Sequence, residues 1–192
     1  METKKEIRRK ILEIRGKMTL EECEDKSIEI ISKVLQSEQF HKARNLLVYV
    51  DYQNEVQTHR LIEVSLQRGK RVFCPKIIEN EMKFFQIMAL SELTEGYKGI
   101  LEPAEIKEKQ WEKYMQTDAS KQKTLVIMPG VAFDRYKHRI GYGKGFYDRF
   151  LKSFGNVVST IALCFTCQLA EQIPYEEFDV IPEYLYTENE IL

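Results

Sequence analysis

The sequence has little net charge, few cysteines and histidines, and no long apolar run. Its 29 Lys and Arg residues nearly cancel its 30 Asp and Glu residues, which leaves a net charge of -1. A protein without a large net charge has no general attraction for nucleic acid or for an anionic membrane. We therefore expect neither as a partner, and any cationic site for phosphate must be local.

The longest apolar runs, such as residues 46–50, are far too short to cross a bilayer. The amino-terminal residues 1–8 are charged, and no apolar segment of a signal peptide follows them. Both observations predict a soluble, cytoplasmic protein.

Cysteine and histidine are too sparse for an obvious metal site. Of the four cysteines, only Cys164 and Cys167 form a Cys-x-x-Cys pair, and the three histidines are scattered. A zinc site needs a second such pair or well-spaced histidines. We therefore predict no zinc, and we expect reduced, mostly buried thiols.

Alternating helices and strands predict one layered α/β domain over residues 1–192. Apolar runs at 46–50 and 124–128 are typical of parallel strands buried on both faces, which predicts a largely parallel central sheet with helices on both faces. Helices are expected at 4–15, 20–36 after a capping box of Thr19 and Glu22, 58–66, 91–95, 146–154 and 166–172. Strands are expected at 46–50, 71–74 closed by Pro75, 82–88, 124–128, 157–165 and, at an edge, 184–186. The polar stretch 105–123 is expected to be a surface excursion.

The most informative segment is residues 139–148, Arg-Ile-Gly-Tyr-Gly-Lys-Gly-Phe-Tyr-Asp. Alternate glycines let backbone N–H groups converge on one point, and the start of the following helix adds partial positive charge. Arg139 and Lys144 add full charges that suit phosphate. The loop therefore predicts a site for the phosphates of a nucleotide.

This loop matches neither standard phosphate motif. A P-loop needs Ser or Thr after Gly-Lys, and a dinucleotide fingerprint needs Gly where Phe146 stands. A surface turn is therefore an alternative on spacing alone. Asp148 is either a Mg²⁺ ligand or a carboxylate that interacts with the helix dipole.

Together with four further blocks, this loop resembles the 5-formyltetrahydrofolate cyclo-ligase family, also called methenyltetrahydrofolate synthetase. The other blocks are Pro-Gly-Val-Ala-Phe-Asp at 129–134, Gly-Ile-Leu-Glu-Pro at 99–103, Asn-Glu-Val-Gln-Thr at 54–58 and Lys-Lys-Glu-Ile-Arg at 4–8. They span nearly the whole chain, and their joint occurrence is far more specific than any single block.

The resemblance implies an enzyme that uses ATP and Mg²⁺ to convert 5-formyltetrahydrofolate to 5,10-methenyltetrahydrofolate, with release of ADP and phosphate. It implies a small-molecule substrate, and we expect a monomer or weak homo-oligomer. Many members carry Tyr where this chain has Phe146, which keeps an apolar contact but lacks the hydroxyl.

The resemblance also assigns roles to residues by position. The implied nucleotide contacts are Lys4, Lys5, Arg8, Arg139, Ile140, Gly141, Tyr142, Gly143, Lys144, Gly145, Phe146 and Tyr147. The implied folate contacts are Val50, Glu55, Tyr142, Gly143, Lys144, Gly145 and Phe146. The implied metal ligands are Asp148 and Asp179, and the expected catalytic residues are Lys144, Arg139 and Tyr147.

The chemistry fits these residue types. An N5-formyl group resembles an amide and is a poor electrophile, so phosphorylation of its oxygen creates a leaving group and lets N10 close the ring. Phosphoryl transfer needs positioned cations and a metal rather than a Ser or Cys nucleophile.

Each assignment has a plainer alternative. Lys4 and Arg8 can be solvated helix residues, Glu55 a loop acid, Val50 a core residue and Asp179 a helix cap. Two other functions share this architecture: a sugar-phosphate isomerase or deaminase-like enzyme, which needs no ATP, and a non-catalytic folate- or nucleotide-binding module.

Overall fold

The computed structural model describes residues 2–96, 99–112, 114, 123–154 and 158–192. The helices are α1 (Lys4–Arg15), α2 (Leu20–Gln36), α3 (Glu38–Lys42), α4 (His59–Gln67) and α6 (Phe146–Lys152), with 3-10 helices η1 (Leu90–Glu92), η3 (Lys107–Lys109) and η6 (Thr166–Gln168). The strands are β1 (Asn45–Val48), β2 (Arg71–Ile78), β3 (Glu81–Ile87), β4 (Thr94–Glu95), β5 (Leu101–Glu102), β6 (Thr124–Met128), β7 (Ala132–Phe133), β8 (Arg139–Ile140), β9 (Ser159–Leu163) and β10 (Tyr184–Tyr186).

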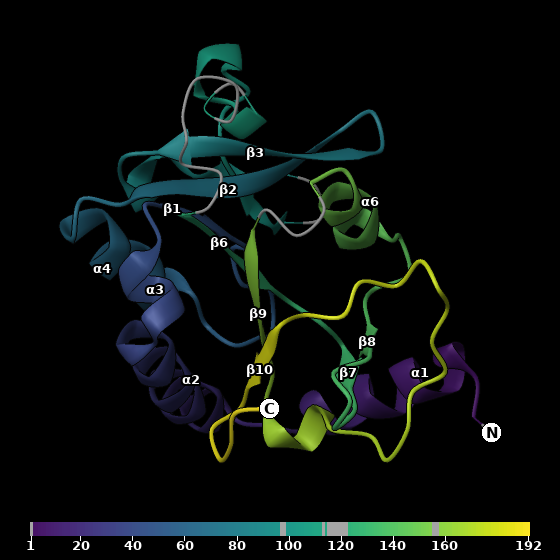
Figure 1. Ribbon diagram of the computed structural model, residues 1–192. Helices are drawn as coiled ribbons and strands as arrows, with labels where there is room; N and C mark the ends of the chain where they lie inside the picture. Colours follow the sequence, from purple (N-terminus) through teal and green to yellow (C-terminus); the bar gives the residue numbers. More distant parts are fainter. Residues whose placement is uncertain (1, 97–98, 113, 115–122, 155–157) are drawn as a thin grey trace.

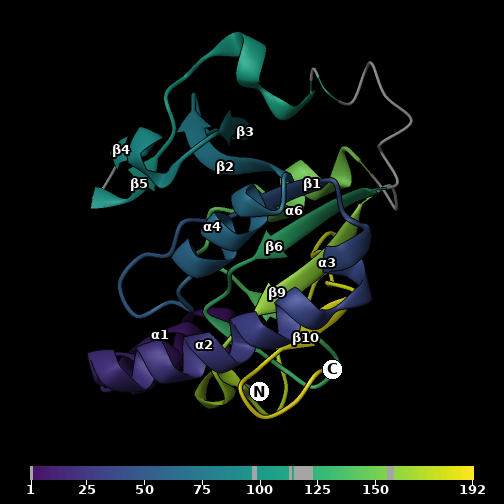
Figure 2. The ribbon, with the colours of Figure 1, turned by 90° about the vertical axis from the view of Figure 1, so that its left-hand side faces the viewer.

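A six-stranded sheet in the order β10-β9-β6-β1-β2-β3 forms the centre of the molecule. All neighbouring strands are parallel except β2 and β3, which form an antiparallel hairpin. Helices α2, α3 and α4 lie on one side of the sheet and α6 on the other (Figures 1 and 2). The predicted fold class is therefore confirmed.

Strand residues alternate between two apolar cores, one on each face of the sheet. In β1, Leu46 and Val48 belong to the core that includes α2 and α4, whereas Leu47 belongs to the core that includes α6. All three side chains are fully buried. Since burying one such side chain contributes about 1.5–3 kcal/mol, burial on both faces explains why the central strands read as continuous apolar runs.

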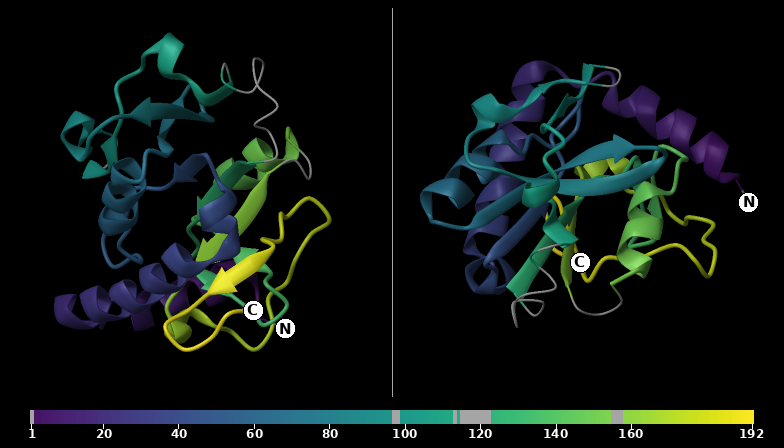
Figure 3. Two further views of the ribbon diagram at one scale, coloured as in Figure 1. Left: turned by 60° about the vertical axis from the view of Figure 1, so that its left-hand side comes forward. Right: turned by 90° about the horizontal axis from the view of Figure 1, so that it is seen from above.

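Helix α1 packs outside the main sheet, against the two-stranded ribbon of β7 and β8 (Figures 1 and 3). Its buried residues Ile7 and Ile11 share a small core with Val131, Ala132 and Ile140. Capping boxes begin both α1 and α2: Thr3 with Glu6, and Thr19 with Glu22. The packing of α1 therefore brings its side chains next to the loop that follows β8.

The structure corrects several expected boundaries. Strand β2 was expected to end before Pro75, but it continues through Pro75 to Ile78. Strand β1 pairs only with its residues 71–73. Beyond them β3 is the strand paired with β2 in the described residues, so the missing N–H of Pro75 breaks no ladder bond on the other side. Arg139 and Ile140, expected in a loop, form β8, and helix α3 was not expected.

Smaller differences concern short segments. The helical turn expected at 91–95 is η1 followed by β4, and the helix expected at 166–172 is the shorter η6. Within the predicted excursion 105–123, residues 113 and 115–122 lie outside the described part of the chain, as does the expected strand start at 157.

Gly130 is required by close packing, which gives a testable prediction. A Cβ atom built on Gly130 would lie 2.3 Å from Cζ of Phe133, whose ring is fully buried. Because the ring cannot easily move aside, Gly130→Ala should lower the free energy of unfolding by about 1–3 kcal/mol in chemical denaturation. Adding Phe133→Leu should recover part of that loss, and an unchanged stability of Gly130→Ala would contradict this account.

Candidate functional site

The glycine loop from Gly141 to Gly145 connects β8 to α6. Gly143 and Gly145 have φ angles of 95° and 62°, in the left-handed region where a side chain would be strained. The Arg8 Nε atom donates a 2.8 Å hydrogen bond to the carbonyl oxygen of Gly141. A Cβ on Gly143 would lie 3.5 Å from Arg8 Nη2, so the guanidinium of α1 lies directly against the loop.

Arg139 and Asp148 form an ion pair across the base of this loop. Arg139 Nη2 lies 2.8 Å from Asp148 Oδ1, and the Arg139 side chain is only 5% exposed. The same carboxylate oxygen accepts a 3.1 Å hydrogen bond from the Val180 amide. Asp148 is therefore close to the segment that contains Asp179, and their role as metal ligands stays a prediction.

Two polar atoms beside this pair are buried and lack a partner among the described residues: Arg139 Nε and the Tyr147 hydroxyl. The Arg139 guanidinium lies 5.8 Å from the centre of the Tyr147 ring. Burial raises the pKa of Tyr147 well above its usual range, so the hydroxyl keeps its proton. A buried donor without a partner is costly, and a bound ligand would supply one.

Lys4 and Asp179 form a second ion pair. Lys4 Nζ lies 2.5 Å from Asp179 Oδ2 and 3.2 Å from Glu176 Oε1. Partial burial lowers the pKa of Lys4, but hydrogen bonds to the two carboxylates outweigh it and raise the pKa. Both predicted metal ligands are thus paired with cations that were predicted to contact the nucleotide.

Glu55 meets the glycine loop through Tyr142. The Tyr142 hydroxyl donates a 2.8 Å hydrogen bond to Glu55 Oε1, and the Tyr52 amide donates to Oε2 at 3.0 Å. Glu55 is 7% exposed. Two bonds hold its segment in place: the Tyr49 hydroxyl donates to the Val56 carbonyl, and the Asn54 amide donates to the Arg15 carbonyl. The loop predicted to bind nucleotide and the acid predicted to bind folate are therefore in direct contact.

The remaining predicted residues have simpler surroundings. Lys5 and Lys144 are exposed, and the ring of Phe146 lies 5.3 Å from the Arg149 guanidinium. Val50 and Ile140 are buried in the apolar cores. Their contacts with ligands stay predictions.

Sequence reasoning missed Arg15 as a site residue. Arg15 Nη2 donates a 2.7 Å hydrogen bond to the Tyr142 oxygen. A signal was present, because Lys4, Arg8 and Arg15 have the spacing of one helix stripe, and all three turn toward the site.

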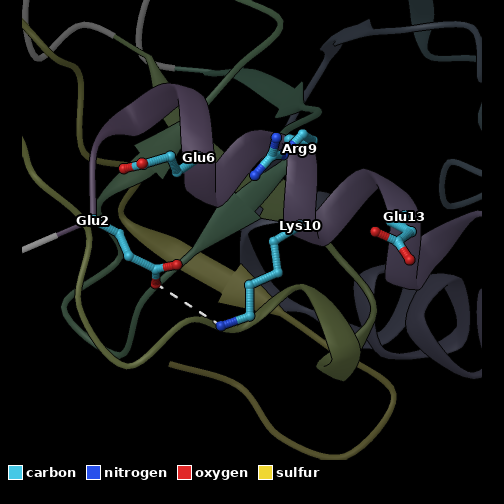
Figure 4. A pocket seen from close by; sticks show the side chains of 5 residues that line it. All are labelled: Glu2, Glu6, Arg9, Lys10 and Glu13. Atoms are coloured by element: carbon cyan, nitrogen blue, oxygen red, sulfur yellow. Dashed lines mark ion pairs between the residues drawn. The ribbon is translucent and has the colours of Figure 1, made fainter.

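A surface hollow lies on the other face of α1 (Figure 4). It is lined by Glu2, Glu6, Arg9, Lys10 and Glu13, and Lys10 pairs with Glu2 at 3.9 Å. Acidic and basic side chains are mixed there on an exposed surface, so we assign no ligand to it.

The described residues lack two further features. Residues 2–96, 99–112, 114, 123–154 and 158–192 contain no group of three or more His, Cys, Asp or Glu side chains that could hold a metal by themselves. In the same residues, no helix has both the length and the apolarity to span a membrane.

The fold and the loop define an α/β protein in which cations, paired carboxylates and a glycine turn surround a site suited to a phosphate-bearing ligand. The chain belongs to the 5-formyltetrahydrofolate cyclo-ligase family, whose model matches residues 1–187. This match confirms the predicted resemblance and places the chain in a family of enzymes.

Individual relatives agree with the family assignment. A Caenorhabditis elegans protein described as a probable 5-formyltetrahydrofolate cyclo-ligase is 32% identical, covering 100% of this chain and 96% of that protein. The solution structure of Aquifex aeolicus 5,10-methenyltetrahydrofolate synthetase superposes with a TM-score of 0.81 at 28% identity, covering 98% of this chain and 91% of that one. An Arabidopsis thaliana relative, 28% identical over 83% of this chain and 64% of its own length, is named as mitochondrial. A cytoplasmic location therefore stays a prediction.

The buried carboxyl of Glu55 should make stability depend on pH. Burial raises its pKa, and the hydrogen bonds from Tyr142 and the Tyr52 amide oppose this only in part. A carboxyl with a raised folded pKa binds its proton more tightly in the folded state, so its cost is absent below the unfolded pKa, grows between the unfolded and the folded pKa, and is complete above the folded pKa. The free energy of unfolding of the wild type, minus that of Glu55→Gln, should therefore fall from about pH 4 to about pH 7. A difference that is constant over this range would be inconsistent with a raised pKa.

Proposed function

We propose that this protein is an ATP-dependent ligase that converts 5-formyltetrahydrofolate to 5,10-methenyltetrahydrofolate and releases ADP and phosphate. One observation carries the proposal: the same loop contacts Arg8 through Gly141 and Glu55 through Tyr142. A reaction that transfers phosphate from a nucleotide to a folate needs both ligands in adjacent pockets. The contact between the two halves supports such a shared site.

Cations from two elements serve the nucleotide half. Lys4 and Arg8 come from α1, and Arg139 comes from β8. The side chain of Lys144 is exposed on the loop. Cations held ready by the fold can neutralise the charge that spreads over the transferring phosphoryl group.

The residues present fit a Mg²⁺ ion that arrives with ATP. Mg²⁺ is usually bound by one or two carboxylates and completed by phosphate oxygens and water. In the described residues, Asp148 uses Oδ1 and Asp179 uses Oδ2 for hydrogen bonds, which leaves one oxygen of each carboxylate for a ligand. On ligand binding we expect both ion pairs to open, so that Lys4 and Arg139 turn to phosphate oxygens. A bound Mg²⁺ would supply further charge neutralisation there.

In the folate half, the carboxylate of Glu55 accepts hydrogen bonds from N–H groups of the pterin ring, which is strong recognition in a dry pocket. The Tyr147 hydroxyl, which has no hydrogen-bond partner among the described residues, donates to an oxygen of the reacting groups. Val50 and Phe146 contribute apolar contact.

The reaction then proceeds in two displacements. The N5-formyl oxygen attacks the γ-phosphorus of ATP, and ADP leaves. N10 attacks the formyl carbon and loses its proton, and phosphate departs with the former formyl oxygen. Residues of this chain position the two ligands and neutralise charge, and no side chain forms a covalent intermediate.

A direct assay tests the proposal. The protein is mixed with 5-formyltetrahydrofolate and Mg²⁺, with and without ATP, and the near-ultraviolet absorbance of the methenyl product is followed. We expect product only when ATP is present, together with stoichiometric ADP. Product without ATP, or binding without turnover, would reject the proposed reaction.

The shared site also predicts coupling between the ligands. Because the loop bounds both pockets, ATP with Mg²⁺ and 5-formyltetrahydrofolate should together raise the melting temperature by more than the sum of their separate effects. Thermal melts with a non-hydrolysable ATP analogue, which prevents turnover during the scan, measure this. If the two shifts in melting temperature simply add at saturating concentrations of both ligands, a shared site is contradicted.

A further inference from the structure

Arg15 is a buried cation at the end of α1 that the proposed reaction does not yet use. It is 2% exposed. Its Nη2 atom donates to the Tyr142 oxygen at 2.7 Å, and its guanidinium carbon lies 5.9 Å from the centre of the Tyr142 ring. Nη1 is buried without a hydrogen-bond partner in the part of the chain that the structure describes. A buried guanidinium is costly unless its charge is compensated.

The hydrogen-bond chain from Arg15 to Glu55 has a fixed direction. A guanidinium only donates, so the Tyr142 oxygen must accept from Arg15 and its one proton must point to Glu55 Oε1. Partial burial and the neighbouring Glu55 carboxylate raise the pKa of Tyr142 to about 12, which keeps that proton in place at neutral pH. The Tyr52 amide holds the other oxygen, Oε2. Both carboxylate oxygens are thus fixed, and each retains a second lone pair for a ligand.

We propose that Arg15 is a positioning residue of the folate pocket: it orients the Tyr142 hydroxyl, which fixes the Glu55 carboxylate for the N–H groups of the substrate. The inference rests on the proposed function, because it takes Glu55 as the folate acceptor. It predicts that Arg15 affects folate affinity and leaves the affinity for ATP and the rate at saturating substrate largely unchanged.

The contacts of the Arg15 backbone make a side-chain test possible. Asn54 donates to the carbonyl oxygens of Arg15 and Met18, at 3.2 and 3.5 Å, and thereby attaches the Glu55 segment to the end of α1. These bonds do not depend on the Arg15 side chain, so a substitution should remove the guanidinium and keep the segment docked.

Arg15→Met removes the charge and keeps most of the apolar stem. We expect it to raise both the Kd of 5-formyltetrahydrofolate without ATP and its KM by about ten-fold, with kcat within about two-fold of wild type. Arg15→Lys should recover part of the affinity, because an ammonium can still donate to Tyr142. The matched control is Arg9→Met, which removes an exposed arginine from the other face of the same helix (Figure 4) and should change neither value.

A pH profile separates positioning from a general loss of structure. The charged and titratable groups around Glu55 are Arg15 of α1, Tyr142 of the loop, Tyr147 of α6, Tyr49 after β1, and Asp51, which itself pairs with His59 of α4. Without Arg15, the Glu55 carboxylate loses a favourable charge and an oriented hydrogen bond. The acid limb of folate binding should therefore move to higher pH in Arg15→Met and stay unchanged in Arg9→Met.

Two further variants make the outcomes distinguishable. If Arg15 acts through Tyr142, Arg15→Met should add little to the effect of Tyr142→Phe, and fully additive effects would overturn the inference. If Glu55→Gln binds folate like the wild type, the proposed folate pocket itself is wrong. If Glu55→Gln weakens binding while folded Arg15→Met and Arg15→Lys match Arg9→Met in affinity and pH profile, only the role of Arg15 is wrong.

Discussion

Lys144→Met should lower turnover on the order of a hundred- to a thousand-fold at saturating ATP, equivalent to about 3–4 kcal/mol of transition-state stabilisation. The ammonium of Lys144 is exposed on the glycine loop, and within the described residues it makes no hydrogen bond or ion pair. The backbone carbonyl of Lys144 accepts a 2.7 Å hydrogen bond from Arg149. This bond does not involve the Lys144 side chain, so the substitution by Met preserves it. The loss should therefore appear in kcat and not in stability.

Lys152→Met is the matched control, because Lys152 is an exposed lysine on the helix that follows the loop. It should turn over like the wild type. Circular dichroism and thermal melts establish that both variants are folded. Near-normal kcat in Lys144→Met, or a loss explained by unfolding, would assign the phosphate contact to Arg139 and the loop backbone instead.

Glu55→Gln should weaken binding of 5-formyltetrahydrofolate roughly a hundred-fold. Hydrogen bonds to a charged partner contribute about 1.5–3 kcal/mol, and an amide at this position accepts at one atom where the carboxylate accepts at two. Gln has nearly the same shape, so the apolar surroundings of the side chain are preserved. Isothermal titration calorimetry with and without ATP measures the change.

The control for this substitution is Glu24→Gln on the exposed face of α2, which should leave folate affinity unchanged. Binding of ATP should be nearly the same in both variants, because Glu55 reaches the glycine loop through a single hydrogen bond. Equal folate affinities for Glu55→Gln and wild type would show that the pterin is recognised elsewhere.

The first two helices were predicted at their observed bounds. Residues 4–15 form α1 and the capping box of Thr19 and Glu22 begins α2, as expected. Strand β6 likewise spans the predicted residues 124–128. Such boundaries depend on capping bonds and apolar runs within a few residues, so they can be read from the sequence.

Strand β2 and strand β8 show where local reading fails. Pro75 was expected to end a strand, but the open edge beyond β1 tolerates it. The Arg139-Ile140 pair was expected in a loop, but it pairs with residues 132–133 in β7. In both cases the deciding factor is which strand lies alongside: β1 pairs with β2 only as far as residue 73, and the short strand β7 lies beside residues 139–140.

The sequence by itself determined the α/β class, the family through five separated motifs, and the residue types that suit phosphate and a metal. Only the tertiary structure decided which of these residues meet: Lys4 with Asp179, Arg139 with Asp148, and Arg15 with Glu55 through Tyr142. The physical reason is that a side chain's partner is fixed by the packing of α1 on the β7–β8 ribbon and of the sheet on its helices. Hydrogen bonds between residues as far apart as 4 and 179 leave no local pattern in the chain, whereas caps and buried strands do.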